Sequence, residues 1–439
     1  MLRRPEELHD IVLKHFPELI GQSDIIKGSK LCKSITFQVT EDCSLRCSYC
    51  YILEKRHNYM SFDTAKKFID DIFEHRKDPS YWINEFNTKV VIIEFIGGEP
   101  LLCISLIRQI CDYFEQKCLE NPDCLWGIFH RYSICTNGVA YFDQEVQEFL
   151  NIYRPITSLT VTIDGCKELH DQCRVFPNGD PSYDIAIKAA LDNLEYGENT
   201  TKITLCPQNV NYIYKGITNM LELGFTAINI NPVFEEGWEI SHARSVYTEF
   251  KQVVDYLIDN NLQDDCYIYM LDVEQYIEKD RNVQDDSTWC GATDCMLAVD
   301  YRGDYYPCIR FMETSLNGEQ EPYKIGSLQQ GLGQTKTDKE ALEKLQNVSK
   351  MIKSPEKCIN CKINSGCSWC IGYCYQKLGT LTERVTYICD VHKAGALATK
   401  YLAKRTKDQE SFNKININYS EVEDIISFEE FKFITQWED

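Results

Sequence analysis

The stretch Thr40-Glu-Asp-Cys-Ser-Leu-Arg-Cys-Ser-Tyr-Cys-Tyr51 decides the fold of this chain. It places three cysteines, Cys43, Cys47 and Cys50, in one short loop with the spacing C-x3-C-x2-C, just after a short apolar strand. Three thiolates can hold three corners of a cubane [4Fe–4S] cluster, which normally takes four cysteine ligands. The fourth iron is then open to a small molecule. The alternative is a set of structural thiols or a zinc knuckle.

The composition is that of a large globular protein with unusually many cysteines. The chain has 439 residues, a formal net charge of −21 and 22 cysteines. An acidic surface repels phosphate backbones, so we expect no nucleic-acid partner. The sequence has no stretch near 18 apolar residues and starts without a signal peptide, so we expect no membrane partner either. Clustered cysteines in such a chain indicate metal ligands in a reduced, cytoplasmic and anaerobic setting.

Short apolar runs alternate with longer helical patterns from residue 35 to about residue 260, with Phe62–His75 and Leu101–Leu119 as examples of the helices. This alternation predicts βαβ units and therefore an α/β fold with a parallel sheet. Six units fit, which suits a partial (β/α)6 TIM-like barrel with its chemistry at the carboxyl ends of the strands. The expected strands are Ile35–Val39, Val90–Ile96, Tyr132–Cys135, Leu159–Ile163, Ile203–Leu205 and Ala227–Val233.

The character of the sequence predicts four segments. Residues 1–34 are a helical lead-in, 35–284 the barrel, 285–390 a loop-rich, cysteine-rich domain, and 391–439 a helix with an acidic tail. The tail is rich in aromatic residues, so we expect it to pack rather than float: Phe412, Tyr419, Phe428, Phe431, Phe433 and Trp437.

Small polar groups follow three of the expected strands. The second strand ends in Gly97-Gly98-Glu99-Pro100, where glycines let the backbone approach a ligand closely. The next two run into Thr136-Asn137-Gly138 and, from Thr162, into Asp164-Gly165, which could hold a ribose or a carboxylate. Arg174 follows shortly after, and Tyr49 lies inside the cysteine loop. A plain turn, a surface ion pair and loop packing are the alternatives for these residues.

Most of the other clustered cysteines lie between residues 290 and 389. Cys290, Cys295 and Cys308 flank the run Val299–Pro307, a hairpin signal with Gly303 in its turn. Cys358, Cys361, Cys367 and Cys370 follow, with Cys374 nearby and Cys389 later; a zinc ribbon is the alternative for the first four. The remaining cysteines are interpreted as small core residues: Cys32, Cys103, Cys111, Cys118, Cys124, Cys135, Cys166, Cys173, Cys206 and Cys266.

The cysteine loop and the Gly97–Pro100 motif resemble the radical S-adenosylmethionine (SAM) superfamily. The resemblance implies that SAM chelates the open iron and that its cleavage gives a 5′-deoxyadenosyl radical. It also implies that the Gly97–Pro100 stretch contacts the SAM ammonium, that Arg174 pairs with its carboxylate and that Tyr49 lies against the adenine.

The cysteines after residue 285 resemble a SPASM domain, which carries two auxiliary [4Fe–4S] clusters. Together with the SAM-binding cluster, the resemblance implies three clusters in all. The first auxiliary cluster would take Cys290, Cys295, Cys308 and Cys370, and the second Cys358, Cys361, Cys367 and Cys389. The spacing between Cys367 and Cys370 is one residue shorter than the usual pattern, which leaves Cys374 as a rival of Cys370.

Several stretches, such as Gly366-Cys-Ser-Trp-Cys370, resemble the CXXX-repeat maturases, which join a cysteine sulfur of a ribosomally made peptide to a carbon of another residue. The implied partners are a cysteine-rich precursor peptide and a flavodoxin- or ferredoxin-type reductant. Only about 34 residues precede the first strand, so leader binding would fall to the C-terminal segment, another surface or a separate protein. The alternatives are an anaerobic sulfatase-maturating enzyme and an electron-transfer or scaffold protein. Against the sulfatase type, Ile309 stands where that type has an aspartate after the hairpin cysteine.

Overall fold

The computed structural model describes residues 5–17, 32–276, 290–348, 354–364 and 366–437. They form two compact units that interleave along the chain. The first unit draws on residues 1–44, 51–159 and 290–348, and the second on 45–50, 160–289 and 349–439. The four consecutive segments expected from the sequence stay a prediction.

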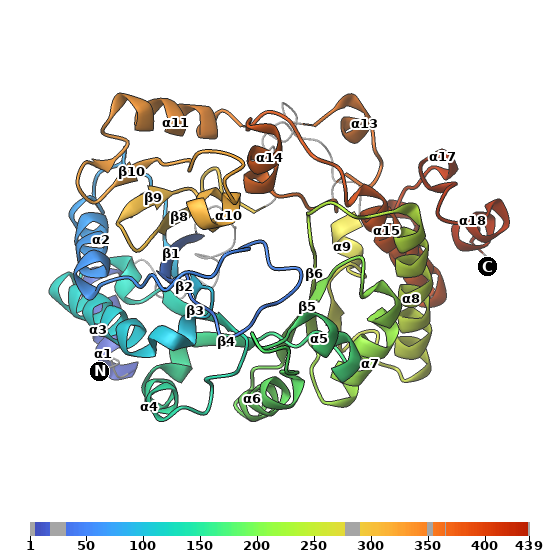
Figure 1. The fold of residues 1–439 in the computed structure, drawn as a ribbon, viewed down its shortest axis with the longest axis horizontal. Coiled ribbons are helices and arrows are strands. Elements are labelled where there is room, and N and C mark those ends of the chain that lie inside the picture. Colours follow the sequence, from blue (N-terminus) through green and yellow to red (C-terminus); the bar gives the residue numbers. More distant parts are fainter. Residues whose placement is uncertain (1–4, 18–31, 277–289, 349–353, 365, 438–439) are drawn as a thin grey trace. The chain divides into compact units, whose positions relative to one another are not determined.

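The first unit is built on an eight-stranded sheet (Figure 1) with the order β11-β10-β9-β8-β1-β2-β3-β4. Its central strands are parallel, and β8 to β11 form antiparallel pairs at one end. The strands are β1 (Cys32–Thr40), β2 (Val90–Gly97), β3 (His130–Thr136), β4 (Thr157–Val161), β8 (Met296–Val299), β9 (Asp304–Tyr306), β10 (Gly326–Ser327) and β11 (Gly331–Leu332).

Helices of the first unit cover this sheet because their apolar residues recur every three or four positions. Helix α2 starts at the N-cap Ser61, whose hydroxyl accepts from the Thr64 amide, and it buries Phe68 against Phe37 of β1 at 5.3 Å. The longer helices are α1 (Pro5–His15), α2 (Phe62–Glu74), α3 (Ile104–Glu120), α4 (Gln144–Tyr153) and α11 (Lys336–Gln346), with the short α10 (Glu313–Leu316).

The second unit holds a smaller parallel sheet with the order β5-β6-β7. A single parallel bridge joins Thr162 to Lys202 of β5. Its strands are β5 (Thr200–Leu205), β6 (Ala227–Pro232) and β7 (Tyr267–Ile268). Its helices are α5 (Lys167–Cys173), α6 (Tyr183–Glu195), α7 (Ile213–Glu222), α8 (Ile240–Asp259), α9 (Val273–Tyr276), α13 (Glu356–Ile359), α14 (Ile371–Leu378), α15 (Cys389–Arg405), α16 (Gln409–Lys414), α17 (Tyr419–Val422) and α18 (Phe428–Thr435).

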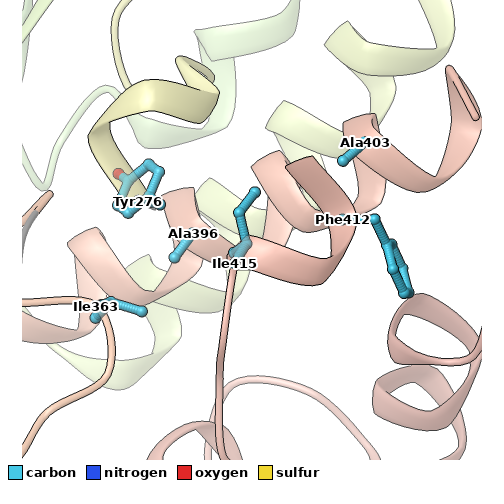
Figure 2. Packing of buried hydrophobic residues seen from close by; sticks show 6 residues of the cluster. All are labelled: Tyr276, Ile363, Ala396, Ala403, Phe412 and Ile415. Carbon is cyan, nitrogen blue, oxygen red and sulfur yellow. The ribbon is translucent and has the colours of Figure 1, made fainter. Parts of the chain in front are cut away.

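Helix α15 is the centre of the second unit's C-terminal part and is buried along most of its length. Figure 2 shows Ala396 and Ala403 of this helix in one apolar cluster with Phe412 and Ile415. Trp437 packs against the same cluster. The tail therefore folds back onto α15, as the aromatic residues predicted, although Phe428 remains half exposed.

The predicted α/β class is confirmed, and each of the six expected strands overlaps an observed one. The structure adds that β8 pairs in parallel with β1, so one sheet continues into the hairpin with Gly303 in its turn. Most of the cysteines expected in the core are buried, but Cys32 and Cys266 are only half-buried. The interpretation was wrong for Cys135, which is exposed because it faces outward on β3. No helix in the described ranges has both the length and the apolar character to span a membrane.

Candidate active site

The start of the cysteine loop lies directly against the end of β2 in the first unit. The Gly98 amide donates to the Thr40 carbonyl at 3.1 Å, and the Glu99 amide donates to the Asp42 carbonyl at 2.8 Å. A Cβ added at Gly98 would lie 2.2 Å from the Asp42 carbonyl oxygen and 2.8 Å from Cys43 Cβ. The predicted close approach at the two glycines is thus, in this structure, an approach to the backbone of the cysteine loop itself.

Glu99 connects three of the predicted site residues in one buried network. Its carboxylate accepts from the Thr136 hydroxyl at 2.6 Å and from the Asn137 amide at 2.8 Å. The Asn137 side chain in turn donates to Ser44 Oγ at 3.0 Å and points its Nδ2 at Cys43 Sγ, 3.8 Å away. Since a buried carboxylate needs such donors, this network fixes the position of the first loop cysteine. Pro100 then opens a short 3-10 helix, Pro100–Cys103.

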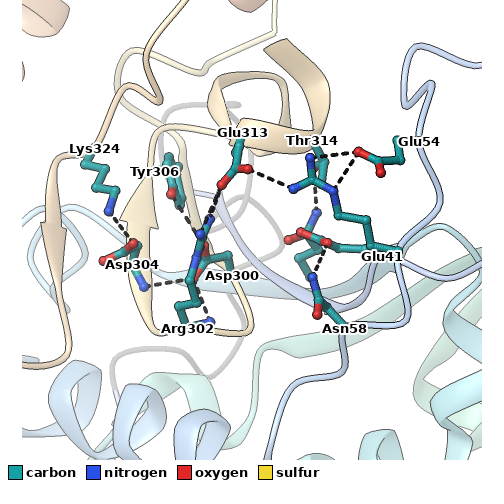
Figure 3. A network of polar contacts seen from close by, with 12 residues as sticks. Glu41, Glu54, Asn58, Asp300, Arg302, Asp304, Tyr306, Glu313, Thr314 and Lys324 are labelled. Carbon is teal, nitrogen blue, oxygen red and sulfur yellow. Dashed lines mark hydrogen bonds and ion pairs between the residues drawn. The ribbon is translucent and has the colours of Figure 1, made fainter. Parts of the chain in front are cut away.

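A network of charges links the segment that follows the cysteine loop, here called the arm (Glu54 to Asn58), to the hairpin (Figure 3). Arg56 on the arm and Arg302 in the hairpin turn both pair with Glu313, at 2.8 and 3.0 Å. Arg302 also pairs with the buried Asp300, which accepts from two backbone amides of the turn. Burial raises the pKa of both Glu41 and Asp300. This network sets the hairpin between Cys295 and Cys308 relative to the arm.

The three hairpin-side cysteines of the first unit differ in exposure: Cys290 is exposed, Cys295 half-buried and Cys308 buried. Burial, together with the neighbouring Asp294, raises the pKa of Cys295 to about 12. Gly291 takes a positive φ of 72°, and a Cβ there would lie 2.8 Å from Cys295 Cβ, so glycine is required at this close turn.

The rest of the cysteine loop belongs to the second unit and pairs with the chain around the end of α5. The Arg46 amide donates to the Val175 carbonyl at 2.7 Å, and the Ser48 amide donates to the Cys173 carbonyl at 2.9 Å. The Cys50 amide donates to the Cys47 carbonyl at 3.1 Å, which closes a turn between two loop cysteines.

Tyr49, Asp164 and Arg174 form one buried chain of hydrogen bonds. The Tyr49 hydroxyl donates to Asp164 at 2.5 Å and accepts from Arg174 Nη1 at 2.8 Å. The Thr204 amide donates to the other Asp164 oxygen at 2.8 Å. Burial raises the pKa of Tyr49 and Asp164, and Arg174 stays protonated because nearby Tyr49, Cys47 and Asp164 outweigh the effect of burial on its pKa. Arg174 Nε is buried and makes no hydrogen bond within the described residues.

A pocket in the second unit is lined by Cys358, Cys367, Cys370 and Cys389. Cys361 lies beside the apolar cluster around α15, where burial raises its pKa to about 12. Cys374 is fully buried and is not part of the lining, whereas Cys370 caps helix α14 by accepting from the Tyr373 amide. Across the described ranges, no three cysteine, histidine or carboxylate side chains converge on a single ion. Ligands of one cubane need not do so, because they bind different irons.

The structure also brings together residues that the sequence did not single out. Arg384 Nη2 lies 3.0 Å from Cys367 Sγ. Cys173 and Cys206, both buried, lie 3.9 Å apart at their sulfurs. Neither pair has a regular spacing, so no pattern in the sequence could have found it. Thr162 is placed by its backbone bridge to Lys202 and lies two residues before Asp164.

Residues 32–174 match the model of a 4Fe–4S single cluster domain. The chain is 23% identical over 445 residues to the radical SAM cyclopropyl synthase TigE of Paramaledivibacter caminithermalis, covering 92% of this chain and 84% of that protein. It is 29% identical over 154 residues to a serine-type anaerobic sulfatase-maturating enzyme of Bacteroides thetaiotaomicron, 32% of this chain and 31% of that one. These similarities relate the chain to radical SAM enzymes, and residues 32–174 to an iron–sulfur cluster domain.

One further relative is matched over only part of its length, and the similar solved structures show the fold alone. An uncharacterised protein of Methanocaldococcus jannaschii is 29% identical over 203 residues, 45% of this chain and 62% of its own length. The solved structure of anSMEcpe with bound AdoMet and Cp18Cys peptide has a TM-score of 0.63 at 17% identity, covering 87% of this chain and 99% of that chain. Streptococcus suis SuiB bound to its precursor peptide SuiA has a TM-score of 0.55 at 15% identity, covering 88% and 82%.

Proposed function

We propose that this chain is a radical SAM enzyme that modifies a ribosomally made, cysteine-rich precursor peptide and installs a thioether between a cysteine sulfur and a carbon of another residue. The observation that carries the proposal is the cysteine loop, whose first cysteine is fixed by Glu99 and Asn137. The loop's sequence resembles the CXXX-repeat maturases. Similar folds bind a precursor peptide in SuiB and a peptide in anSMEcpe, which supports a peptide substrate.

The loop residues suit a SAM-binding cluster. Cys43, Cys47 and Cys50 would ligate it, and soft thiolates are the usual donors to such iron. Arg174 keeps a buried, unused Nε within the described part of the chain, which suits recognition of the SAM carboxylate. Tyr49 would face the adenine. When bound, SAM and the reduced cluster supply a 5′-deoxyadenosyl radical.

Two further clusters fit the remaining cysteines. Cys358, Cys361, Cys367 and Cys389 would hold one of them. The pocket in the second unit supports Cys358, Cys367 and Cys389, which line it together with Cys370, while Cys361 is not part of its lining. Cys290, Cys295 and Cys308 would hold the other with Cys370 as its fourth ligand. Cys370 is half-buried whereas Cys374 is fully buried, so Cys370 is the more accessible thiol of the two.

The peptide loses two hydrogen atoms in this reaction. One leaves a C–H bond as a hydrogen atom to the adenosyl radical. The other would leave the thiol as a proton as the S–C bond forms, and an auxiliary cluster, when bound, would accept the one surplus electron. A flavodoxin- or ferredoxin-type protein would supply the first electron, and the net charge of −21 suits a basic leader segment bound directly or through a separate protein.

The similarity to TigE over nearly the whole chain favours a second candidate, formation of a cyclopropyl group on a peptide. A third, conversion of serine or cysteine to formylglycine, is supported by the sulfatase-maturating relative, although Ile309 lacks the carboxylate expected after Cys308. The fourth candidate is an electron-transfer protein without SAM chemistry, but such a protein would not need the network around Glu99.

One experiment separates these candidates. Reduced, reconstituted enzyme is incubated with SAM and a synthetic precursor rich in cysteine, and the product is treated with iodoacetamide or a hydrazide before mass spectrometry. A thioether gives a peptide lighter by two hydrogens with one fewer alkylated thiol. A peptide equally light with all thiols alkylated indicates the cyclopropyl reaction, a hydrazone indicates formylglycine, and no 5′-deoxyadenosine indicates a carrier.

A further inference from the structure

Arg384 is the charged side chain among the described residues that line the cysteine pocket of the second unit. Its Nη2 donates to Cys367 Sγ at 3.0 Å. Its guanidinium lies 5.1 Å from the centre of the Trp369 ring, and Nη1 donates to Ser354 Oγ at 3.4 Å. The side chain is therefore held in one orientation from three sides.

The guanidinium also has a hydrogen-bond donor that the protein leaves unused. Arg384 Nε is buried and makes no hydrogen bond within the described residues. A buried N–H without an acceptor is costly, so such a group in a native site usually donates to a water, an ion or a bound group. The sulfide of a cluster bound by Cys367 is an acceptor of the right kind.

The other cations near this pocket are differently placed. Lys393 is paired with Asp390 at 2.8 Å, which offsets its charge next to Cys389. Lys357, beside Cys358, is exposed, and its hydrogen bond within the described residues goes to the Thr386 hydroxyl at 3.5 Å. Solvent screens such an exposed charge, whereas the guanidinium contacts the ligand sulfur itself.

We infer that Arg384 raises the reduction potential of the auxiliary cluster held by Cys367. Hydrogen bonds to ligand sulfurs and local charge are established determinants of cluster potential. Reduction adds one negative charge to the cluster, and a fixed cation with N–H donors stabilises that reduced form. Arg384 thus makes this cluster a better acceptor for the electron that S–C bond formation releases. The inference rests on the proposed auxiliary cluster and assigns Arg384 a tuning role through Cys367.

The test is a potentiometric titration of full-length enzyme followed by electron paramagnetic resonance. The signal of interest is the one that a Cys389→Ala variant abolishes. We expect Arg384→Gln to keep its iron and to disfavour reduction of this cluster at least tenfold, a downward shift of about 59 mV for a one-electron couple. Arg384→Lys keeps the positive charge but loses the paired N–H donors of the guanidinium, so its reduction potential should lie between those of the wild type and Arg384→Gln. Lys357→Gln should change the equilibrium less than threefold.

Three outcomes would overturn the inference: an unchanged potential in Arg384→Gln, an equal shift in Lys357→Gln, or loss of the cluster iron from both Arg384 variants, which would show a purely structural role. Failure of the proposed auxiliary cluster looks different. In that case wild-type enzyme gives no signal that depends on Cys389, and its iron content does not fall in Cys389→Ala.

Discussion

Gly98→Ala tests how the structure holds the first loop cysteine. The new methyl group would lie 2.2 Å from the Asp42 carbonyl oxygen, where ordinary contact starts at 3.4 Å, and 2.8 Å from Cys43 Cβ. The atoms it meets are backbone atoms, which cannot rotate away. The loop and the end of β2 must therefore separate by about 1 Å, which breaks the hydrogen bond from Glu99 N to Asp42 O.

The expected cost follows from these contacts. Crowding of this kind destabilises by about 1–3 kcal/mol, and the lost hydrogen bond adds about 1 kcal/mol. A displacement of about 1 Å at a reacting group costs about 10²-fold in rate. We therefore expect SAM-dependent 5′-deoxyadenosine formation to fall by about 10²-fold, with a lower denaturation midpoint.

Gly179→Ala is the matched control. Gly179 has a φ of 86° and nothing within 4 Å of an added Cβ, so the change costs about 1–2 kcal/mol of backbone strain without crowding the loop. Its rate of 5′-deoxyadenosine formation should match the wild type. Wild-type iron content and a wild-type rate in Gly98→Ala would refute the reasoning.

Three further predictions concern stability and ligand choice. Asp164→Leu removes the carboxylate that reaches the buried Arg174 cation through the Tyr49 hydroxyl. It should cost about 3–5 kcal/mol in urea denaturation, most of which Asp164→Leu/Arg174→Leu should recover, and equal midpoints for wild type and single variant would contradict this. Burial lowers the pKa of His170 to about 2, so below about pH 6.5 the unfolded chain binds one more proton than the folded chain. The free energy of unfolding should therefore decrease by up to about 1.4 kcal/mol for each unit by which the pH is lowered in this range. His170→Gln should reduce this slope by the same amount. An unchanged slope would count against this. Cys370→Ala should lose auxiliary-cluster iron while Cys374→Ala keeps it, and the reverse result would assign the ligand to Cys374.

The strands and the hairpin turn could be predicted because their causes are local. Strand β2 falls on an almost unbroken apolar run, Val90–Ile96, which the sequence shows directly, whereas its alternation of buried and half-buried residues appears only in the structure. Gly303 takes a φ of 88°, which a glycine between two apolar runs already indicates. The folding back of the tail was also predictable, since aromatic residues such as Phe412 need cover.

Contacts between distant segments could not be predicted in this way. The pairing of β8 with β1 joins Ser34 to Met296, and a short apolar strand does not reveal its partner. The same holds for Arg384 and Cys367, because a single arginine carries no spacing signal. The Gly97–Gly98 motif was recognised, but that its glycines admit the backbone of Thr40 and Asp42 emerged only from the structure.

The most direct measurement compares wild type with a Cys43→Ala/Cys47→Ala/Cys50→Ala variant after anaerobic reconstitution. Iron, sulfide, low-temperature resonance spectra and 5′-deoxyadenosine are measured on both. The account predicts about four fewer irons per chain in the variant, loss of one reducible signal and no 5′-deoxyadenosine, with the auxiliary clusters intact. The same iron content and the same adenosyl product in both proteins would contradict it.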